Sequence, residues 1–228
     1  LQGVIMANPR GAGLSDQAVA SAVERAFRKG KPAAVALAIN SPGGSPAQSS
    51  LIAARIRRLA EEKGVPVHAF VEDVAASGGY WLACAADKIW ADRTSILGSI
   101  GVISAGFGFH DAISRIGVER RVHTAGESKS ILDPFRPEKA EDVERLKALQ
   151  GELHETFIEH VKSSRGERLS DHPELFTGAF WTGSKSVELG LADGIGHLVP
   201  KMKELYGDKT RFAVYGPRRS LLGRFGIS

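Results

Sequence analysis

The chain has 228 residues, of which 43% are hydrophobic and 25% charged, and its formal net charge is +4. This composition is typical of a globular protein, and no apolar run approaches the roughly 20 residues of a membrane-spanning helix. The single cysteine, Cys84, excludes an intramolecular disulfide and a CxxC metal site. The chain begins without an initiator methionine and shows no secretory signal pattern, so we expect any anchor or signal to lie upstream.

Positive charge is concentrated towards the C-terminal end. After Asp208 there are five basic residues and no acidic one, and the rest of the chain holds 25 basic against 26 acidic residues. Because this body is near neutral, we expect no binding to nucleic acid. The tail 217–228 mixes basic and apolar residues. This pattern fits a peripheral contact with anionic lipid, a segment packed on a neighbouring protomer, or a frayed terminus.

The first half of the chain alternates between strand and helix patterns. Ser45 followed by Pro46 predicts a helix start, and Gly64 marks that helix's end. The alternation favours a parallel sheet with right-handed crossovers. The expected elements are a strand at 4–6, a helix from 15 to 30, a strand at 33–39, a helix at 46–63 and a strand at 65–71.

The second half predicts shorter strands and one long amphipathic helix. We see no repeat and no linker, so we predict a single domain over 1–216 followed by the tail 217–228. The expected elements are helices at 82–86, 109–116, 138–164, 183–190 and 198–206, strands at 88–91, 118–122 and 211–214, and an apolar, glycine-punctuated segment at 95–103.

Ser77 stands where a predicted strand passes into a predicted helix, between small residues. A serine at a helix N-terminus lies among free backbone N–H groups that favour negative charge, and the glycines after it allow close backbone approach. This is the local geometry that a nucleophilic serine needs. The same pattern also fits a helix N-cap followed by packing glycines.

A second glycine turn, Ser41-Pro42-Gly43-Gly44, follows the preceding predicted strand. Active sites of open α/β sheets gather beyond the carboxyl ends of the strands. If the two strands are neighbours, the N–H groups near Gly43 or Gly44 and that of Gly78 can form an oxyanion hole for a carbonyl attacked by Ser77. The general base is not evident from the residues, because none of the seven histidines has a context that marks it.

Five motifs stand in order along the chain: Asn40-Ser41-Pro42-Gly43-Gly44, Ala75-Ala76-Ser77-Gly78-Gly79-Tyr80, Gly98-Ser99-Ile100-Gly101, Gly126-x-x-Lys129, and Trp181-Thr182-Gly183 with Gly190-Leu191-x-Asp193. Together they resemble the signal peptide peptidase A family of serine peptidases over roughly residues 1 to 200. The resemblance implies an α/β fold, the crotonase/ClpP-like spiral of parallel strands with crossover helices.

By this resemblance Ser77 is the nucleophile, Lys129 is the general base of a Ser–Lys dyad, and Ser99 orients that lysine. A lysine acts as a base only when it is neutral, which requires a dry pocket and a hydroxyl rather than a carboxylate as partner. Ser128 stands where the family commonly has an aromatic residue. No cofactor and no metal are expected.

The resemblance further implies a bacterial, membrane-associated endopeptidase that forms a ring-shaped homo-oligomer. In such rings the lysine of one protomer serves the serine of its neighbour. The expected substrates are unfolded or membrane-derived peptides such as remnant signal peptides. Two alternatives remain: a ClpP-type peptidase with a Ser-His-Asp triad, and a crotonase-like protein that binds acyl-CoA and has no use for a serine at position 77.

Overall fold

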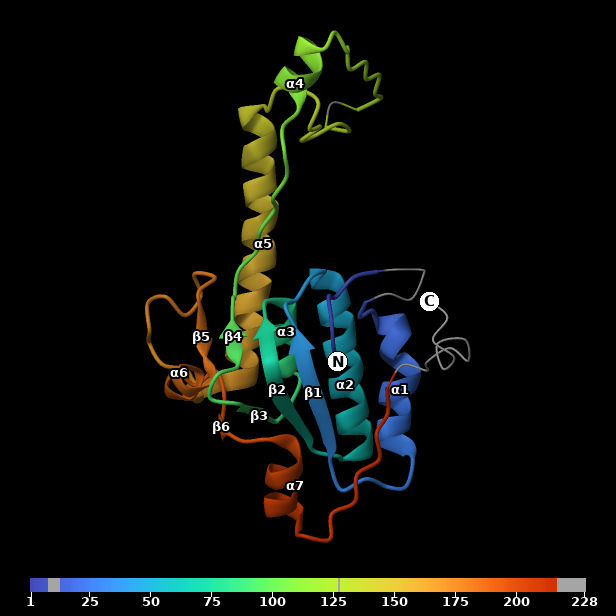
Figure 1. The fold of residues 1–228 in the computed structure, drawn as a ribbon, viewed down its shortest axis with the longest axis vertical. Helices are drawn as coiled ribbons and strands as arrows, with labels where there is room; N and C mark the ends of the chain where they lie inside the picture. The colour runs from blue at the N-terminus through green and yellow to red at the C-terminus, as the bar shows by residue number, and fades with distance from the viewer. Residues whose placement is uncertain (8–12, 127, 217–228) are drawn as a thin grey trace. The chain divides into compact units, whose positions relative to one another are not determined.

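The computed structural model describes residues 1–7, 13–126 and 128–216 (Figure 1). The chain divides into two compact units, the first formed by residues 1–101 and 157–228, the second by residues 102–156. The predicted single domain over 1–216 stays a prediction, and the tail 217–228 lies outside the described residues.

The first unit has an α/β fold, a mixed sheet with helices packed on it. Its strands are β1 (Val35–Ser41), β2 (Val67–Ala76), β3 (Lys88–Ala91), β4 (Ile96–Gly98), β5 (Phe180–Thr182) and β6 (Gly194–Ile195). Its helices are α1 (Asp16–Arg28), α2 (Pro46–Lys63), α3 (Gly78–Ala83), the end of α5 (Ala140–Arg165), a 3₁₀ turn at Gly166–Arg168, α6 (Gly183–Glu188) and α7 (Leu198–Tyr206).

The strand β2 is the centre of this sheet because three other strands pair with it. Ala75 is matched by Ser41 of β1 on one edge and by Leu97 of β4 on the other. The first half of β2 pairs with β1 on one side and with β3 on the other. β3 and β4 therefore pair with successive parts of the same side of β2. All these pairs are parallel, and only β5 runs antiparallel, on β4. The predicted α/β class with a parallel sheet is confirmed.

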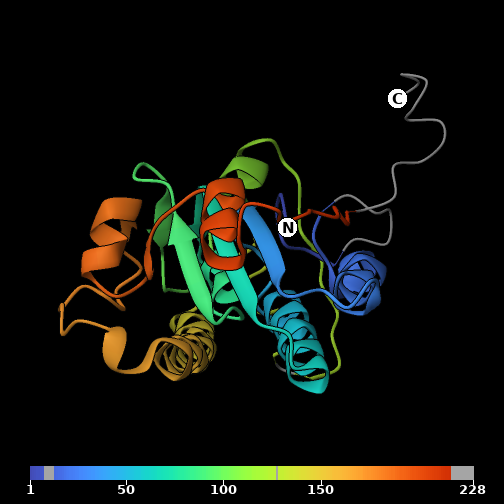
Figure 2. The same ribbon diagram turned by 90° about the horizontal axis from the view of Figure 1, so that it is seen from below.

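Helices α1 and α2 lie side by side along the sheet (Figures 1 and 2). The side chain of Ser15 caps α1 by accepting a hydrogen bond from the Ala18 N–H at 3.2 Å, and Ser45 caps α2. Gly64 ends α2 in the left-handed conformation with φ 60°. These caps confirm the predicted helix boundaries. Ile52 and Ile56 of α2 are fully buried in the core, as is Ile39 of β1.

The second unit contains α4 (His110–Arg115) and the first part of α5, joined by irregular chain. The predicted strand at 118–122 is wrong, because the described residues of this unit include no strand with which its valines could pair. The predicted strand at 211–214 is also wrong, since that segment is extended but unpaired. At 4–6 there are only isolated bridges, in which Ile5 pairs with Leu14 and Gly44.

Candidate active site

Ser77 occupies a strained turn between β2 and α3. Its dihedral angles are φ 52° and ψ −122°, which are those of the first central residue of a type II′ turn. This conformation costs a residue with a side chain on the order of 1–3 kcal/mol, and such strain is concentrated at functional sites. The Ser77 hydroxyl makes no capping hydrogen bond, and the residue is only partly buried. Ser77 is therefore the N-cap residue of α3 by position, as the helix-cap alternative predicted, but its hydroxyl is not engaged in capping the helix.

The two glycine turns touch each other. Gly43 follows β1 with φ 100°, and a Cβ added there would lie 2.7 Å from the Gly78 nitrogen and 2.9 Å from the Ser77 Cβ. Gly79 packs just as tightly against the backbone carbonyl of Ser41. Only glycine allows these approaches, so the glycines at positions 43 and 79 are explained by the contact between the two turns.

Backbone donors surround this contact. The Gly78 N–H opens α3, and the first N–H groups of a helix have no acceptor within it. The Gly43 N–H donates to the Ser41 hydroxyl oxygen at 3.2 Å, and that fully buried hydroxyl donates to the Gly3 carbonyl at 2.7 Å. Gly44 lies against the Ile5 carbonyl with no room for a side chain.

The segment around Ile5 holds the first glycine turn from outside. The Ile5 N–H donates to the Gly43 carbonyl and the Ser45 N–H donates to the Ile5 carbonyl, both at 2.8 Å. Sequence reasoning missed the supporting roles of Ser41 and Ile5. The hydroxyl of Ser41 next to the Pro-Gly-Gly turn was a readable signal, whereas the contact with Ile5 connects residues about 40 positions apart and left no local pattern.

Ser99 lies beside Ser77. The parallel register of β2 and β4 ends at the pair Ala76 and Gly98, so the next residue on each strand is a serine. The Ser77 N–H donates to the Gly98 carbonyl at 2.8 Å. Ser99 also has a positive φ, 52°, and its N–H donates to the Ala179 carbonyl at 2.7 Å. Two partly buried serines in strained turns therefore stand at the carboxyl ends of neighbouring strands.

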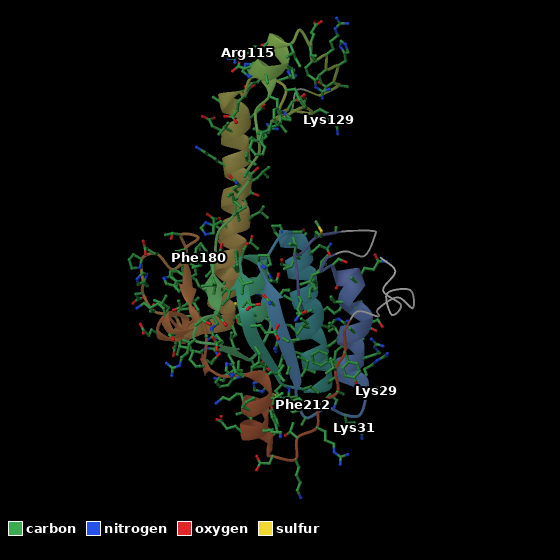
Figure 3. The ribbon with its side chains drawn as sticks, viewed as in Figure 1. Lys29, Lys31, Arg115, Lys129, Phe180 and Phe212 are labelled. Carbon is green, nitrogen blue, oxygen red and sulfur yellow. The ribbon has the colours of Figure 1, made fainter. Side chains whose placement is uncertain are left out.

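Lys129 belongs to the second unit, where its side chain is exposed (Figure 3). Its backbone N–H donates to the Gly126 carbonyl at 3.2 Å. The neighbouring Ser128 accepts a hydrogen bond from Arg145 at 2.8 Å. A hollow of about 530 Å³ in this unit contains none of the predicted site residues. Lys129 as the base therefore stays a prediction, while the other five predicted site residues lie together in the first unit.

The histidines of the first unit are engaged elsewhere. His68 meets the Tyr206 hydroxyl at 2.9 Å and the Trp90 indole N–H at 3.3 Å, and burial lowers the pKa of His68. His160 stacks on Trp81 with ring centroids 4.5 Å apart, and burial lowers its pKa as well. The Ser77 hydroxyl has no hydrogen bond to any residue that the structure describes, histidines included.

A buried ion pair explains the Gly190-Leu191-x-Asp193 motif. Arg165 at the end of α5 is 1% exposed and donates to Asp193 at 2.8 Å and to the Gly190 carbonyl at 2.8 Å. Although burial alone would raise the pKa of Asp193, hydrogen bonds from the Ile89 N–H and from Arg165 lower it to about 2. The motif therefore fixes α5 to the sheet, and its Leu191 carbonyl accepts a hydrogen bond at 2.8 Å from the hydroxyl of Tyr80, three residues after Ser77.

Cysteine and metal chemistry find little support in the described part of the chain. Burial raises the pKa of the Cys84 thiol to about 11, so the thiolate is disfavoured. Within residues 1–7, 13–126 and 128–216, no group of three or more His, Cys, Asp or Glu side chains is placed to hold a metal ion. No helix among them is long and apolar enough to cross a membrane.

Residues 59–208 match the family model of peptidase family S49. The chain belongs to this family. The suspected relationship to signal peptide peptidase A is thus confirmed, and so, at the level of the family, is the serine-type peptidase class. The matched region includes Ser77, Ser99 and Lys129, and it begins after the first glycine turn.

Curated relatives support the assignment. The chain is 32% identical over 171 residues to a putative protease of Methanocaldococcus jannaschii, covering 75% of this chain and 54% of that protein. It is 32% identical over 204 residues to protease 4 of Haemophilus influenzae, covering 86% of this chain and 32% of that protein. It therefore spans about a third to a half of these relatives.

Two further matches differ in kind from these relatives. The chain is 56% identical over 211 residues to a Brucella melitensis protein named as a Na(+)/H(+) antiporter, covering 92% of this chain but 29% of that protein. A name given to the whole of that protein does not define the activity of the aligned part. Among solved structures, a mutant of the 1510-N membrane-bound stomatin-specific protease matches with a TM-score of 0.56 and 15% identity, covering 90% of this chain and 80% of that one. This likeness supports the ClpP/crotonase-like S49 fold.

Proposed function

We propose that this chain is a serine endopeptidase in which Ser77 is the nucleophile and Lys129 the general base of a Ser–Lys dyad. Ser99 accepts or donates a hydrogen bond that orients the lysine. The Gly78 N–H and an N–H of the Gly43 and Gly44 turn hold the oxyanion. The observation that carries this proposal is the strained Ser77, whose uncapped hydroxyl stands beside both glycine turns.

In the proposed reaction the neutral Lys129 amine takes the Ser77 hydroxyl proton while the serine oxygen attacks the peptide carbonyl carbon. The carbonyl oxygen gains negative charge and is bound by the backbone N–H donors. The lysine then gives its proton to the leaving amine, the C–N bond breaks and an acyl-enzyme remains. Water hydrolyses this ester by the same proton transfers in reverse order and restores the serine.

The burial pattern of the second unit supports an oligomer. None of its described residues is buried as a whole, and Ile103 and Phe107 are 86% and 80% exposed. A unit of this size without a core needs a covering partner to be stable. We propose that neighbouring copies of the chain supply it in a ring-shaped homo-oligomer, and that Lys129 of one protomer serves Ser77 of the next. The enclosed chamber would admit unfolded or membrane-derived peptides, remnant signal peptides among them, and exclude folded proteins.

We further propose a membrane-associated location in a bacterium, with the tail 217–228 contributing to contact with lipid or with a neighbouring protomer. Its alternation of arginines with apolar residues supports either role. Deletion of residues 217–228 is expected to weaken liposome binding or to shift the oligomer in sedimentation. If neither measurement changes, the tail has neither role.

The test of the dyad uses a fluorogenic peptide and a serine-directed fluorophosphonate. Ser77→Ala is expected to abolish both cleavage and labelling, and Lys129→Ala to abolish cleavage. Lys139→Ala, another exposed lysine of the second unit, is the matched control and should retain activity. Full activity of Lys129→Ala would disprove the dyad. An essential histidine would favour the ClpP-type triad, and acyl-CoA binding unaffected by Ser77→Ala would favour the crotonase-like alternative.

A further inference from the structure

Several connections of the first unit lie at the end of the sheet where its parallel strands begin, which we call the amino-terminal edge. β1 and β2 are parallel and start in register, with Val35 opposite Val67, and the Val35 N–H donates to the Pro66 carbonyl at 2.9 Å. The connections from α1 to β1 and from α2 to β2 therefore reach the same edge. This edge lies at the opposite end of β2 from Ser77, about 30 Å away for ten residues at roughly 3.3 Å each.

The segment that follows α7 passes along the same edge. The Tyr206 hydroxyl at the end of α7 meets His68 near the start of β2 at 2.9 Å. Further on, the Tyr215 ring lies under the Arg25 guanidinium in the last turn of α1, 5.9 Å from the ring centroid. Residues 207–214 must therefore cross from β2 to the end of α1, and they do so in both views of the ribbon (Figures 1 and 2).

These connections carry unpaired positive charge. Six basic residues, all exposed, lie on them or at the last residue of the helix before them, and none forms an ion pair with any described residue. Of the acidic residues near this end, Glu61 and Glu62 are paired with arginines of α2, whereas the exposed Asp208 stands next to Lys209 without an ion pair to a described residue. We call this group the amino-edge basic cluster. It consists of Arg28, Lys29, Lys31, Lys63, Lys209 and Arg211.

Apolar side chains project from the same segment. Phe212 is 41% exposed and Val214 is 93% exposed, directly after Arg211. Figure 3 labels Phe212, Lys29 and Lys31 at the same end of the first unit. Exposed apolar side chains among unpaired cations are the pattern of surfaces that lie on anionic membranes, where the cations meet headgroups and the apolar groups enter the acyl boundary.

We propose that the amino-edge basic cluster, with Phe212 and Val214, is a docking surface for an anionic phospholipid bilayer. The 93% exposed Val214 distinguishes this surface from one that binds a nucleic acid, which uses cations for the phosphates and aromatic rings for stacking on bases and has no use for an exposed valine. Because the surface and Ser77 lie at opposite ends of β2, lipid binding leaves the proposed catalytic edge uncovered.

The test measures how much of the full chain sediments with phospholipid vesicles. One set of vesicles is phosphatidylcholine alone, and the other contains roughly 30–40% of the anionic lipid phosphatidylglycerol. Wild type is expected to bind the anionic vesicles, and to lose binding as salt is raised. The triple variant Lys29→Gln/Lys31→Gln/Arg211→Gln should bind on the order of 100-fold more weakly, from about fivefold for each basic residue near the surface. Phe212→Ser/Val214→Ser should reduce the binding that remains at high salt.

The matched control is Arg115→Gln/Arg136→Gln/Lys147→Gln, which removes the same charge from exposed positions of the second unit. The control should bind the anionic vesicles like wild type, and the cluster variant should keep Ser77 labelling by fluorophosphonate. Equal vesicle binding by wild type and the cluster variant would overturn the proposal. So would equal loss in both triple variants, or binding of single-stranded RNA in preference to vesicles.

Discussion

Gly43→Ala tests the contact between the two glycine turns more directly than any change to the serine. An added Cβ at Gly43 would lie 2.7 Å from the Gly78 nitrogen, 2.8 Å from the Ala76 carbonyl oxygen and 2.9 Å from the Ser77 Cβ. All three are too close for a carbon atom, and two of the three atoms belong to the backbone. The alanine can therefore be accommodated only if one turn moves away from the other.

The free-energy cost of Gly43→Ala has two parts. Gly43 has φ 100°, and a residue with a side chain in that region costs on the order of 1–3 kcal/mol. Relief of the overlap costs a further ~1–3 kcal/mol. If the turn moves, one proposed oxyanion donor is displaced, and the loss of one such donor lowers kcat by about 10² to 10³. We expect Gly43→Ala to unfold at lower denaturant and to be nearly inactive while still folded.

Gly30→Ala is the control, because Gly30 also has a positive φ, 77°, but an added Cβ there meets nothing within 4 Å. Gly30→Ala should therefore carry the same kind of backbone strain as Gly43→Ala but keep the peptidase activity of wild type. The assays are urea unfolding, which gives the free energy of unfolding, and peptide cleavage with fluorophosphonate labelling of the folded enzyme. If Gly43→Ala cleaves peptide with a kcat close to that of wild type, the assignment of the oxyanion hole to this turn is refuted.

Three further outcomes are expected. Ser41→Ala should lower the free energy of unfolding by about 1–3 kcal/mol in urea titrations, because it leaves the buried Gly43 N–H without its acceptor. Asp193→Asn should cost about 3–5 kcal/mol because Arg165 stays buried without its partner, whereas the exposed-pair control Glu188→Gln should cost less than about 1 kcal/mol. Burial lowers the pKa of His68 below 6.5 in the folded state, so the unfolded state binds more protons near and below pH 6.5. Stability should therefore fall from pH 8 to pH 5 in urea titrations, and His68→Gln should make that fall smaller.

The elements that could be predicted were those with a local cause. The capping serine at position 45 and the glycine at position 64 fixed the ends of α2, and the apolar runs located β1 and β2. The strand predicted at 118–122 failed because β structure depends on a partner strand, which β-propensity alone cannot supply. β2 also extends to Ala76, five residues past its apolar run, because β4 pairs with residues whose sequence gives no strand signal.

The serine turn was recognisable from its sequence, but its strain was not. A serine before two glycines is equally typical of an ordinary helix cap, and only the φ of Ser77 in the structure and the missing side-chain cap bond distinguish it from one. The neighbour relation of Ser77 and Ser99 follows from the register of β2 and β4, which no local pattern records. The supporting role of Ile5 could not be predicted for the same reason, since it comes from a contact between residues distant in sequence.

The two units differ in what they can do alone. The first has a core that fixes Ser77, Ser99 and both glycine turns through backbone bonds, so the proposed nucleophile and the proposed oxyanion donors are held within this unit. The second, which carries Lys129, has no residue that is buried as a whole among those described. A proton acceptor must be held to within a hydrogen-bond length of its partner to act as a base. If Lys129 is that base, its precision must come from whatever covers the second unit. Peptidase activity should therefore depend on protein concentration, whereas the strained geometry of Ser77 should not.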